Sequence, residues 1–240
     1  MLGAGRRLGS RAAYEAKTLV AASPRLTVAA ARWRGHGEVV GPGSDILIEG
    51  YPRSANQFSV AAFRLAQGRP MRVAHHTHAP GHVLAALRLH VPAIVLIRDP
   101  CDSVLEFVLV RPTLTVRQAL RGWIRFYSAL QAHRARFVTG PFSEVTSDFG
   151  AVIRRANERF GSAFVPFDHT EENVRECFRQ MDAYWEGRIG ATEELERYVG
   201  RPSATRDRWK DDLLETYLRL SSALRSGAEE LYRNFAGGAS

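Results

Sequence analysis

A short loop after an apolar run has the residue types of an anion-binding site. The run Ile46-Leu47-Ile48 predicts a buried strand, and an amphipathic helical pattern follows the loop. A strand, a tight turn and a helix N-terminus aim backbone N–H groups and the positive end of a helix dipole at one point, which suits a phosphate or sulfate. The candidate binding residues are Arg53, which adds a positive charge, and Ser54, Ala55, Asn56, Gln57 and Phe58.

A second group of candidates is the histidine-rich segment His75-His76-Thr77-His78. A strand alternates its faces, so His76 and His78 could share one side while His75 points away, and no neighbouring Cys or acidic residue completes a metal site. Core histidines without chemistry are a further interpretation. An imidazole with a pKa near neutral is also suited to proton abstraction, which makes His78 a candidate general base.

A third group, Arg98-Asp99-Pro100, follows the apolar run 93–97. On its own this group indicates a strand end followed by a helix that begins at proline, with Asp99 close to Arg98. An arginine at this place could also bind an anion.

The elements that must position these groups alternate between strand and helix patterns after residue 44. We expect strands at 46–51, 72–75, 93–97 and 137–139, which predicts an α/β domain with a central parallel sheet. Helices are expected from the loop to Gly68, at 82–90, at 115–130 and at 148–161. The rest is expected to be helical apart from a loop at 200–206 and a frayed tail at 237–240. In such a sheet ligands bind at the carboxyl ends of the strands.

Composition sets limits on partners and compartment. The chain has 240 residues, 45 % hydrophobic content, a net charge of +8 and a pI near 10.1, which fits one domain and anionic ligands. Arginine is spread along the chain without a basic run or an aromatic stripe, so nucleic acid is not an expected partner. The two cysteines lack metal or redox spacing, and no apolar stretch is long enough to span a bilayer. A cytoplasmic protein is expected.

The first 44 residues form a basic leader, expected to be helical or partly flexible, before the α/β domain at 45–236. Seven Lys and Arg residues against two Glu give the first 40 residues a net charge of +5. Such a segment could be a transit segment, an amphipathic helix on anionic lipid or a solvated helix. Peripheral membrane contact through this leader therefore stays open.

The loop 51–58, Y-P-R-S-A-N-Q-F, resembles the Y-P-K-S-G-T-T-W loop of the sulfotransferases, which binds the 5′-phosphosulfate of 3′-phosphoadenosine 5′-phosphosulfate (PAPS). Arg53 stands for Lys, Ala55 for Gly, and Asn56 and Gln57 for the two Thr residues. Asn tolerates a left-handed backbone, so we expect Asn56 to accommodate the turn. The Gly-Lys pair of nucleotide-triphosphate loops is absent.

The other two groups also resemble sulfotransferase signatures. In the family's K-T-H-x-P segment the His removes the acceptor's proton, which implies that His78 is the general base and places His76 where the family has Lys. In R-[ND]-P-x-D-x-x-x-S the Arg binds the 3′-phosphate, which Arg98 matches, but Glu106 stands in place of Ser. A carboxylate repels a phosphate. Ser103 could serve instead, Glu106 could turn toward Arg111 or another base, or the site could have lost its ligand.

Two further segments resemble the family less closely. Phe142 would replace the Tyr near adenine in the family's Y-E-D-L segment. The segment 201–210 is similar to R-K-G-x-x-G-x-W-K, a loop that covers the 3′-phosphate, through Arg201 and the pair Trp209-Lys210. Arg206 either replaces the lost basic residue or belongs to an Arg-rich surface loop.

The resemblance spans residues 45–209, with the segments in the family's order. It implies a three-layer α/β/α fold of the P-loop nucleotide-kinase-like type and sulfuryl transfer from PAPS, without a metal, to a small-molecule, lipid or sugar acceptor. One alternative is a sulfotransferase-fold binding protein without activity, which Glu106 and the altered late segment favour. The other is a small kinase, which would need the absent lysine and magnesium-binding hydroxyl.

Overall fold

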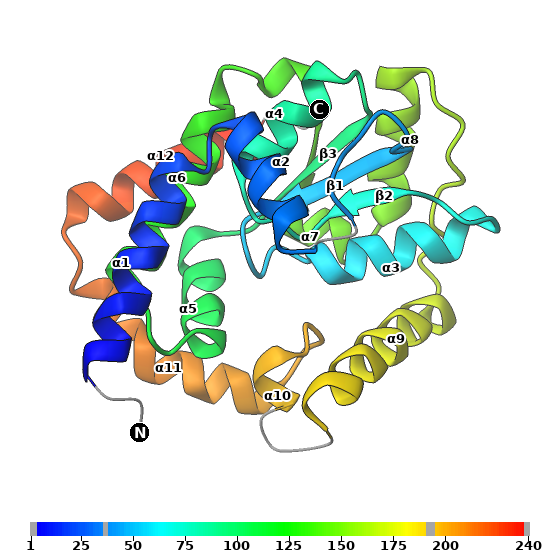
Figure 1. The fold of residues 1–240 in the computed structure, drawn as a ribbon. Helices are drawn as coiled ribbons and strands as arrows, with labels where there is room; N and C mark the ends of the chain where they lie inside the picture. Colours follow the sequence, from blue (N-terminus) through cyan, green and yellow to red (C-terminus); the bar gives the residue numbers. More distant parts are fainter. Residues whose placement is uncertain (1–3, 36–37, 191–194, 238–240) are drawn as a thin grey trace.

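The computed structural model describes residues 4–35, 38–190 and 195–237, and its centre is a parallel β-sheet (Figure 1). Four strands lie in the order β2-β1-β3-β4. Their bounds are Ile46–Gly50 for β1, Val73–His75 for β2, Ala93–Ile97 for β3 and Val138–Pro141 for β4. The predicted α/β class with a central parallel sheet is confirmed.

The sheet is buried on both faces, as the near-continuous apolar strands require. Alternate residues of β1 point to opposite sides, so Leu47 belongs to one core cluster while Ile46 and Ile48 belong to the other. The first cluster is covered by α4 (Pro80–Arg88), α5 (Pro100–Val110), α6 (Val116–Gln131) and α12 (Ser222–Ala236). The second is covered by α3 (Asn56–Gln67), α8 (Phe149–Phe160) and α9 (Glu171–Ile189). These layers form a three-layer α/β/α domain.

The order of the strands places a topological switch point between β1 and β3. The chain leaves β1 through α3 on one face to reach β2, and then returns through α4 on the other face to reach β3. Ligands bind where connections diverge in this way, at the carboxyl ends of the strands. The two strands lie so close there that only glycine fits at position 50: an added Cβ atom would be 2.7 Å from the Leu96 carbonyl oxygen.

Most predicted boundaries are confirmed, and the capping residues explain them. Thr115 and Gln118 form a reciprocal capping box at the start of α6, and Asp148 accepts a hydrogen bond from the Ala151 N–H at the start of α8. Gly161 ends α8 with φ 63°. Helix α4 begins at Pro80, two residues before its expected start, because proline suits the first helical position.

The helical prediction is wrong for residues 162–170. This segment is irregular, and two side chains bind its backbone in place of helical hydrogen bonds. Asn157 binds the N–H and the carbonyl of Phe164, and Gln67 binds those of Val165. A nearby side chain, Asn157, and a distant one, Gln67 of α3, thus satisfy backbone groups that a helix would have paired.

The predicted loop at 200–206 is shorter than expected. Helix α10 (Leu195–Tyr198) precedes it, and α11 (Ala204–Leu218) begins inside the expected range. The Ser203 hydroxyl accepts from the Arg206 N–H at 3.3 Å, which caps α11. Arg206, Trp209 and Lys210 therefore lie on a helix.

The first described residues form two helices that pack on the domain (Figure 1). Helix α1 (Ala4–Val20) lies on α6, where Glu15 pairs with Arg125, and α2 (Pro24–Trp33) lies on α4. The Tyr14 ring fills the space beside Gly122, where an added Cβ would overlap the Tyr14 hydroxyl. The domain boundary at 44 stays a prediction, and the predicted tail lies outside the described residues beyond Gly237.

The described helices include none that is both long and apolar enough to cross a membrane.

Candidate functional site

The loop between β1 and α3 contains two non-glycine residues with left-handed backbone. Arg53 has φ 71° and Ala55 has φ 65°. The expectation that Asn56 accommodates this turn is wrong: Asn56 is the first residue of α3, and its Nδ2 donates to the Tyr51 carbonyl at 3.0 Å. The left-handed backbone of Arg53 and Ala55 is strained, at a cost of roughly 1–2 kcal/mol for each residue. Such strain is typical of backbone held in place for a ligand.

Helix α3 begins with backbone N–H groups that have no acceptor in the described part of the chain. Ala55, the residue before the helix, offers no side-chain acceptor, and no bond is found for the amides of Asn56, Gln57 and Phe58. The Phe58 side chain lies in the core, and the Gln57 Oε1 accepts from the Trp185 Nε1 at 3.0 Å. The loop can therefore bind an anion through its backbone.

Tyr127 of α6 supports the loop from the core. Its hydroxyl donates to the Leu96 carbonyl at 2.8 Å and accepts from the Tyr51 N–H at 3.4 Å. The same hydroxyl lies 3.5 Å from the Ser54 hydroxyl, which is fully buried. The Ser54 N–H donates to the Tyr51 carbonyl at 3.3 Å, so Ser54 supports the turn and neither its hydroxyl nor its N–H is presented to a ligand.

The Arg53 guanidinium points to α5 and α10. It pairs with the Glu106 carboxylate at 2.8 Å, and donates to the carbonyls of Tyr198 at 3.0 Å and Val199 at 3.1 Å. Arg53 thereby fastens the loop to two helices.

Glu106 is surrounded by cations. Besides Arg53, its carboxylate lies 3.3 Å from the Arg206 Nε and 3.7 Å from the Lys210 Nζ. Burial favours the neutral acid, but Arg53 and Arg206 outweigh it and lower the pKa of Glu106. Of the possibilities that the sequence leaves open, Glu106 turns toward these bases; no pairing with Arg111 is found in the described structure.

Arg98 extends from the end of β3 over the loop. It donates to the Arg53 carbonyl at 3.3 Å, and its guanidinium lies 4.2 Å from the centre of the Phe142 ring in α7 (Phe142–Val145). Its Nε is buried and unpartnered. Ser103 is less available, because its buried hydroxyl donates to the Pro52 carbonyl at 2.9 Å.

Two of the predicted binding residues have other contacts. Arg201 pairs with Asp182 at 3.2 Å and with Glu196 at 2.5 Å. The Trp209 ring lies 4.8 Å from the Arg197 guanidinium. The structure thus brings five of the predicted binding residues together around the loop: Arg53, Arg98, Ser103, Phe142 and Arg206. The other two, Arg201 and Trp209, contact α9 and α10.

His78 lies at the carboxyl end of β2, beside the end of β1. Its Nδ1 is 2.9 Å from the Gly50 carbonyl oxygen, and its side chain is 26 % exposed. Burial lowers the pKa of His78 from its ordinary value, so the imidazole is neutral at pH 7. The rings of His76 and His78 are 5.5 Å apart.

His75 contacts His76 through their Nδ1 atoms, with ring centres 4.5 Å apart, so the expectation that His75 points away from this pair is wrong. His75 is buried, it lies 3.1 Å from the Glu38 carboxylate, and burial and the charges of His76 and Arg64 lower its pKa to about 3. In the described structure no group of three His, Cys, Asp or Glu side chains is arranged to hold a metal ion.

Glu49 is the residue that sequence reasoning missed. It is fully buried at the end of β1, and its Oε2 accepts from the Thr77 N–H at 2.9 Å, the Thr77 hydroxyl at 2.9 Å and the His82 Nδ1 at 3.0 Å. Burial raises the pKa of a carboxyl group, but these donors and the nearby histidines hold the pKa of Glu49 well below its usual range. The sequence did contain a signal for this residue, because a single carboxylate inside an apolar strand is rarely buried without a partner.

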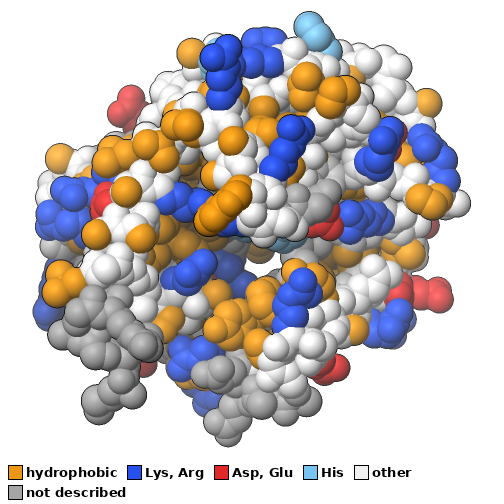
Figure 2. Space-filling view, in the orientation of Figure 1, with side chains coloured by type: hydrophobic (Ala, Val, Ile, Leu, Met, Phe, Trp, Pro, Cys, Tyr) orange, Lys and Arg blue, Asp and Glu red, His pale blue; other side chains and the backbone are white. Residues whose placement is uncertain are grey.

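A hollow marks the site on the surface. Figure 2 shows it between α5, α3 and α10, with basic side chains and histidine on its wall.

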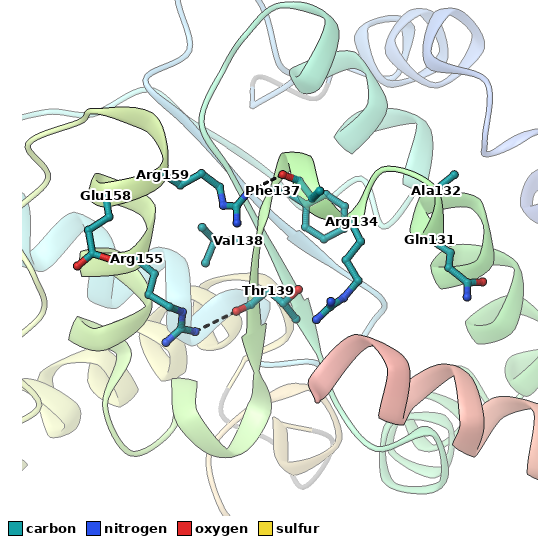
Figure 3. Close-up of a pocket in the computed structure, with 10 residues that line it drawn as sticks. Gln131, Ala132, Arg134, Phe137, Val138, Thr139, Arg155, Glu158 and Arg159 are labelled. Carbon is teal, nitrogen blue, oxygen red and sulfur yellow. Dashed lines mark hydrogen bonds between the residues drawn. The ribbon is translucent and has the colours of Figure 1, made fainter. Parts of the chain in front are cut away.

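A separate cavity of about 870 Å³ lies at the beginning of β4 (Figure 3). Its arginines are already bound: Arg134 to the Phe235 carbonyl, Arg155 to Glu144 and the Thr139 carbonyl, and Arg159 to the Ala135 carbonyl. It is not at the carboxyl ends of the strands, so we do not place the candidate site there.

Comparison with known proteins identifies similarity in overall structure. A crystal structure of mouse sulfotransferase SULT7A1 complexed with PAP has a TM-score of 0.40 and 15% identity, over 78% of this chain and 88% of that chain. No protein-family model and no curated protein matches the chain.

Proposed function

We propose that this protein is a P-loop sulfotransferase that moves a sulfuryl group from PAPS to an acceptor hydroxyl or amine. The observation that carries the proposal is the contact between His78 and Gly50. A carbonyl oxygen can only accept, so the His78 Nδ1 carries the proton and the neutral ring keeps the lone pair of its Nε2. A base with this lone pair, at the beginning of the anion-binding loop, is what the reaction needs.

The donor would bind along the loop. The N–H groups of Asn56, Gln57 and Phe58 and the dipole of α3 favour the phosphosulfate, and Arg53 adds positive charge. Arg98, with its unpartnered Nε and the neighbouring Phe142 ring, is suited to the 3′-phosphate and the adenine side. The cations Arg53, Arg98, Arg206 and Lys210 pair with three carboxylates, those of Glu106, Asp102 and Asp207, so this set keeps one positive charge in excess.

The reaction would be an in-line displacement. The acceptor oxygen forms a bond to sulfur while the bond from sulfur to the 5′-phosphate oxygen breaks, and the acceptor's proton passes to the His78 Nε2. The loop N–H groups and Arg53 stabilise the charge that develops on the leaving phosphate. His76 lies close enough to His78 to line the acceptor side. The loop has no magnesium-binding hydroxyl, and the proposal requires no metal.

A binding protein of the same fold is the second candidate, because the Arg53 guanidinium is already engaged by Glu106 and two carbonyls. If this pairing persists when the donor is present, Arg53 is unavailable for catalysis.

Calorimetric titration with 3′-phosphoadenosine 5′-phosphate (PAP), adenosine 5′-phosphate and ATP with magnesium distinguishes these functions. We expect micromolar binding of PAP, weakened at least tenfold in Arg98→Ala and in Arg53→Ala, since each removes a charge-assisted contact. Arg88→Ala at the exposed end of α4 is the matched control.

Binding of PAP without sulfuryl transfer to any tested acceptor would favour the binding protein. Preference for ATP with magnesium would favour a kinase, and no binding of PAP would refute the donor site.

A further inference from the structure

The hydrogen-bond partners of His82 fix which of its nitrogens carries the proton. The backbone N–H of Val40 donates to the His82 Nε2 at 2.9 Å, so this nitrogen has a lone pair. The proton of the neutral ring is then on Nδ1, which lies 3.0 Å from the Glu49 Oε2. His82 is therefore a donor to Glu49.

The two oxygens of Glu49 have unequal surroundings. Oε2 accepts three hydrogen bonds, from the Thr77 N–H, the Thr77 hydroxyl and His82. Oε1 accepts from the Gly50 N–H at 3.2 Å, and it lies 3.6 Å from the His78 Nδ1. Oε1 is thus the oxygen that faces His78, the imidazole of the proposed function.

We infer that Glu49 is a positioning residue for His78: its carboxylate, with the Gly50 carbonyl, orients the Nδ1–H toward β1 and stabilises the imidazolium that forms when Nε2 accepts a proton. The catalytic part of this inference rests on the proposed sulfuryl transfer, whereas the pairing of Glu49 with His78 does not.

Hydrogen bonding accounts for part of the preference for a carboxylate at this place. Both oxygens of Glu49 accept, whereas a neutral amide could accept from Thr77 and His82 but would turn its NH2 toward the Gly50 N–H. The negative charge is useful where a neighbouring group becomes positive. A separation of 3.6 Å is too long for a hydrogen bond, but catalytic contacts often shorten once the reacting complex forms.

The charges around His78 act in opposite directions. Lys17 of α1 and Arg111 at the end of α5 disfavour its protonation, whereas Glu49 of β1 favours it. His76 and His82 also lie on this side, and both interact with Glu49, while His75 contacts His76. Among the described carboxylates, Glu49 lies 3.6 Å from the His78 Nδ1 and favours the protonation of His78.

Nitrogen NMR of the histidine rings tests the pairing without any acceptor. In the wild-type protein at high pH, with signals assigned through His78→Gln, we expect His78 to be the Nδ1–H tautomer. In Glu49→Gln we expect the pKa of His78 to fall by about one to two units, because the opposite charge is lost. Glu49→Asp keeps the charge and should shift it less, and Glu38→Gln, which alters the carboxylate beside His75, is the matched control.

Kinetics then tests the catalytic role. Once an acceptor is known, Glu49→Gln should lower kcat about 10- to 100-fold and move the acidic limb of the pH profile to lower pH, with KM for PAPS unchanged. Glu49→Asp should recover part of the loss in kcat. A residue that only supports the fold would not move the acidic limb.

Three outcomes decide between the possibilities. An Nε2–H tautomer in the wild-type protein, which needs no variant to fold, overturns the inference. A His78 titration in Glu49→Gln equal to that in Glu38→Gln also overturns it, provided that both variants bind PAP like the wild type. If the titration shifts but no variant or wild type binds PAP, the Glu49–His78 pairing stands and the sulfotransferase proposal fails.

Discussion

Two buried glutamates lie on either side of the loop, and their surroundings differ. Glu106 is 4 % exposed and faces permanent cations, Arg53, Arg206 and Lys210. Glu49 is 0 % exposed and faces neutral donors, Thr77 and His82. A carboxylate held by permanent cations fastens helices together, whereas one held by neutral donors keeps its charge for a partner that becomes positive.

The largest effect is expected from Glu106→Ser. The change leaves Arg53 and Arg206 without their buried counter-charge, so the free energy of unfolding should fall by about 3–5 kcal/mol in urea titrations. The same change frees these cations, so PAP should bind more tightly. Glu215→Ser, which removes an exposed pair with Arg219, is the control and should change stability little. Unaltered stability in Glu106→Ser would mean that the pairing does not fasten the loop.

An intermediate effect concerns pH and the histidine side of the site. The pKa of His75 is about 3 in the folded chain against 6.5 when unperturbed, so the unfolded state binds more protons between these values. The contribution of His75 to the free energy of unfolding is fully present above pH 6.5 and is lost as the pH falls toward 3. At pH 5 the loss from His75 is about 2 kcal/mol relative to pH 7. Urea titrations of the wild type and His75→Asn at pH 5 and pH 7 measure this loss. An equal change in the free energy of unfolding between the two pH values in both proteins would contradict the prediction.

The smallest effect is expected in the backbone of the loop. Ala55→Gly should raise the free energy of unfolding by about 1 kcal/mol, because glycine adopts the φ of 65° without strain. Thermal unfolding should show a higher Tm. Ala61→Gly within α3 should instead destabilise, since its backbone is helical. A loss of stability in both variants would show that the loop is not strained at Ala55.

The sequence predicted what depends on local pattern. Strand β3 was expected at 93–97 and is found at Ala93–Ile97, and the capped ends of α6 and α8 follow from Thr115 and Asp148. The loop and its neighbours His78 and Arg98 were also recognisable from residue types.

Contacts between distant residues could not be predicted in this way. Glu49 meets His82 across 33 residues of sequence, and Arg53 meets Glu106 across 53. The pattern predicts that Glu49 is on a strand, but only the pairing of β1 with β2 brings Thr77 to it. The late segment was expected as a loop because the capping role of Ser203 was not recognised.

The packing of Tyr14 in α1 against Gly122 in α6 also determines when α1 can dock during synthesis of the chain. The ribosome makes α1 before α6, and Glu15 meets Arg125 only 110 residues later. At roughly 5–20 residues per second, α1 waits several seconds or more with Tyr14 uncovered. During that time this basic helix is open to chaperones and other surfaces, and it docks only when the notch at Gly122 has emerged. The contact between Tyr14 and Tyr51, at 3.1 Å, belongs to the same docking step, and it precedes the contacts of Arg53 with Tyr198 and Val199, which are synthesised later.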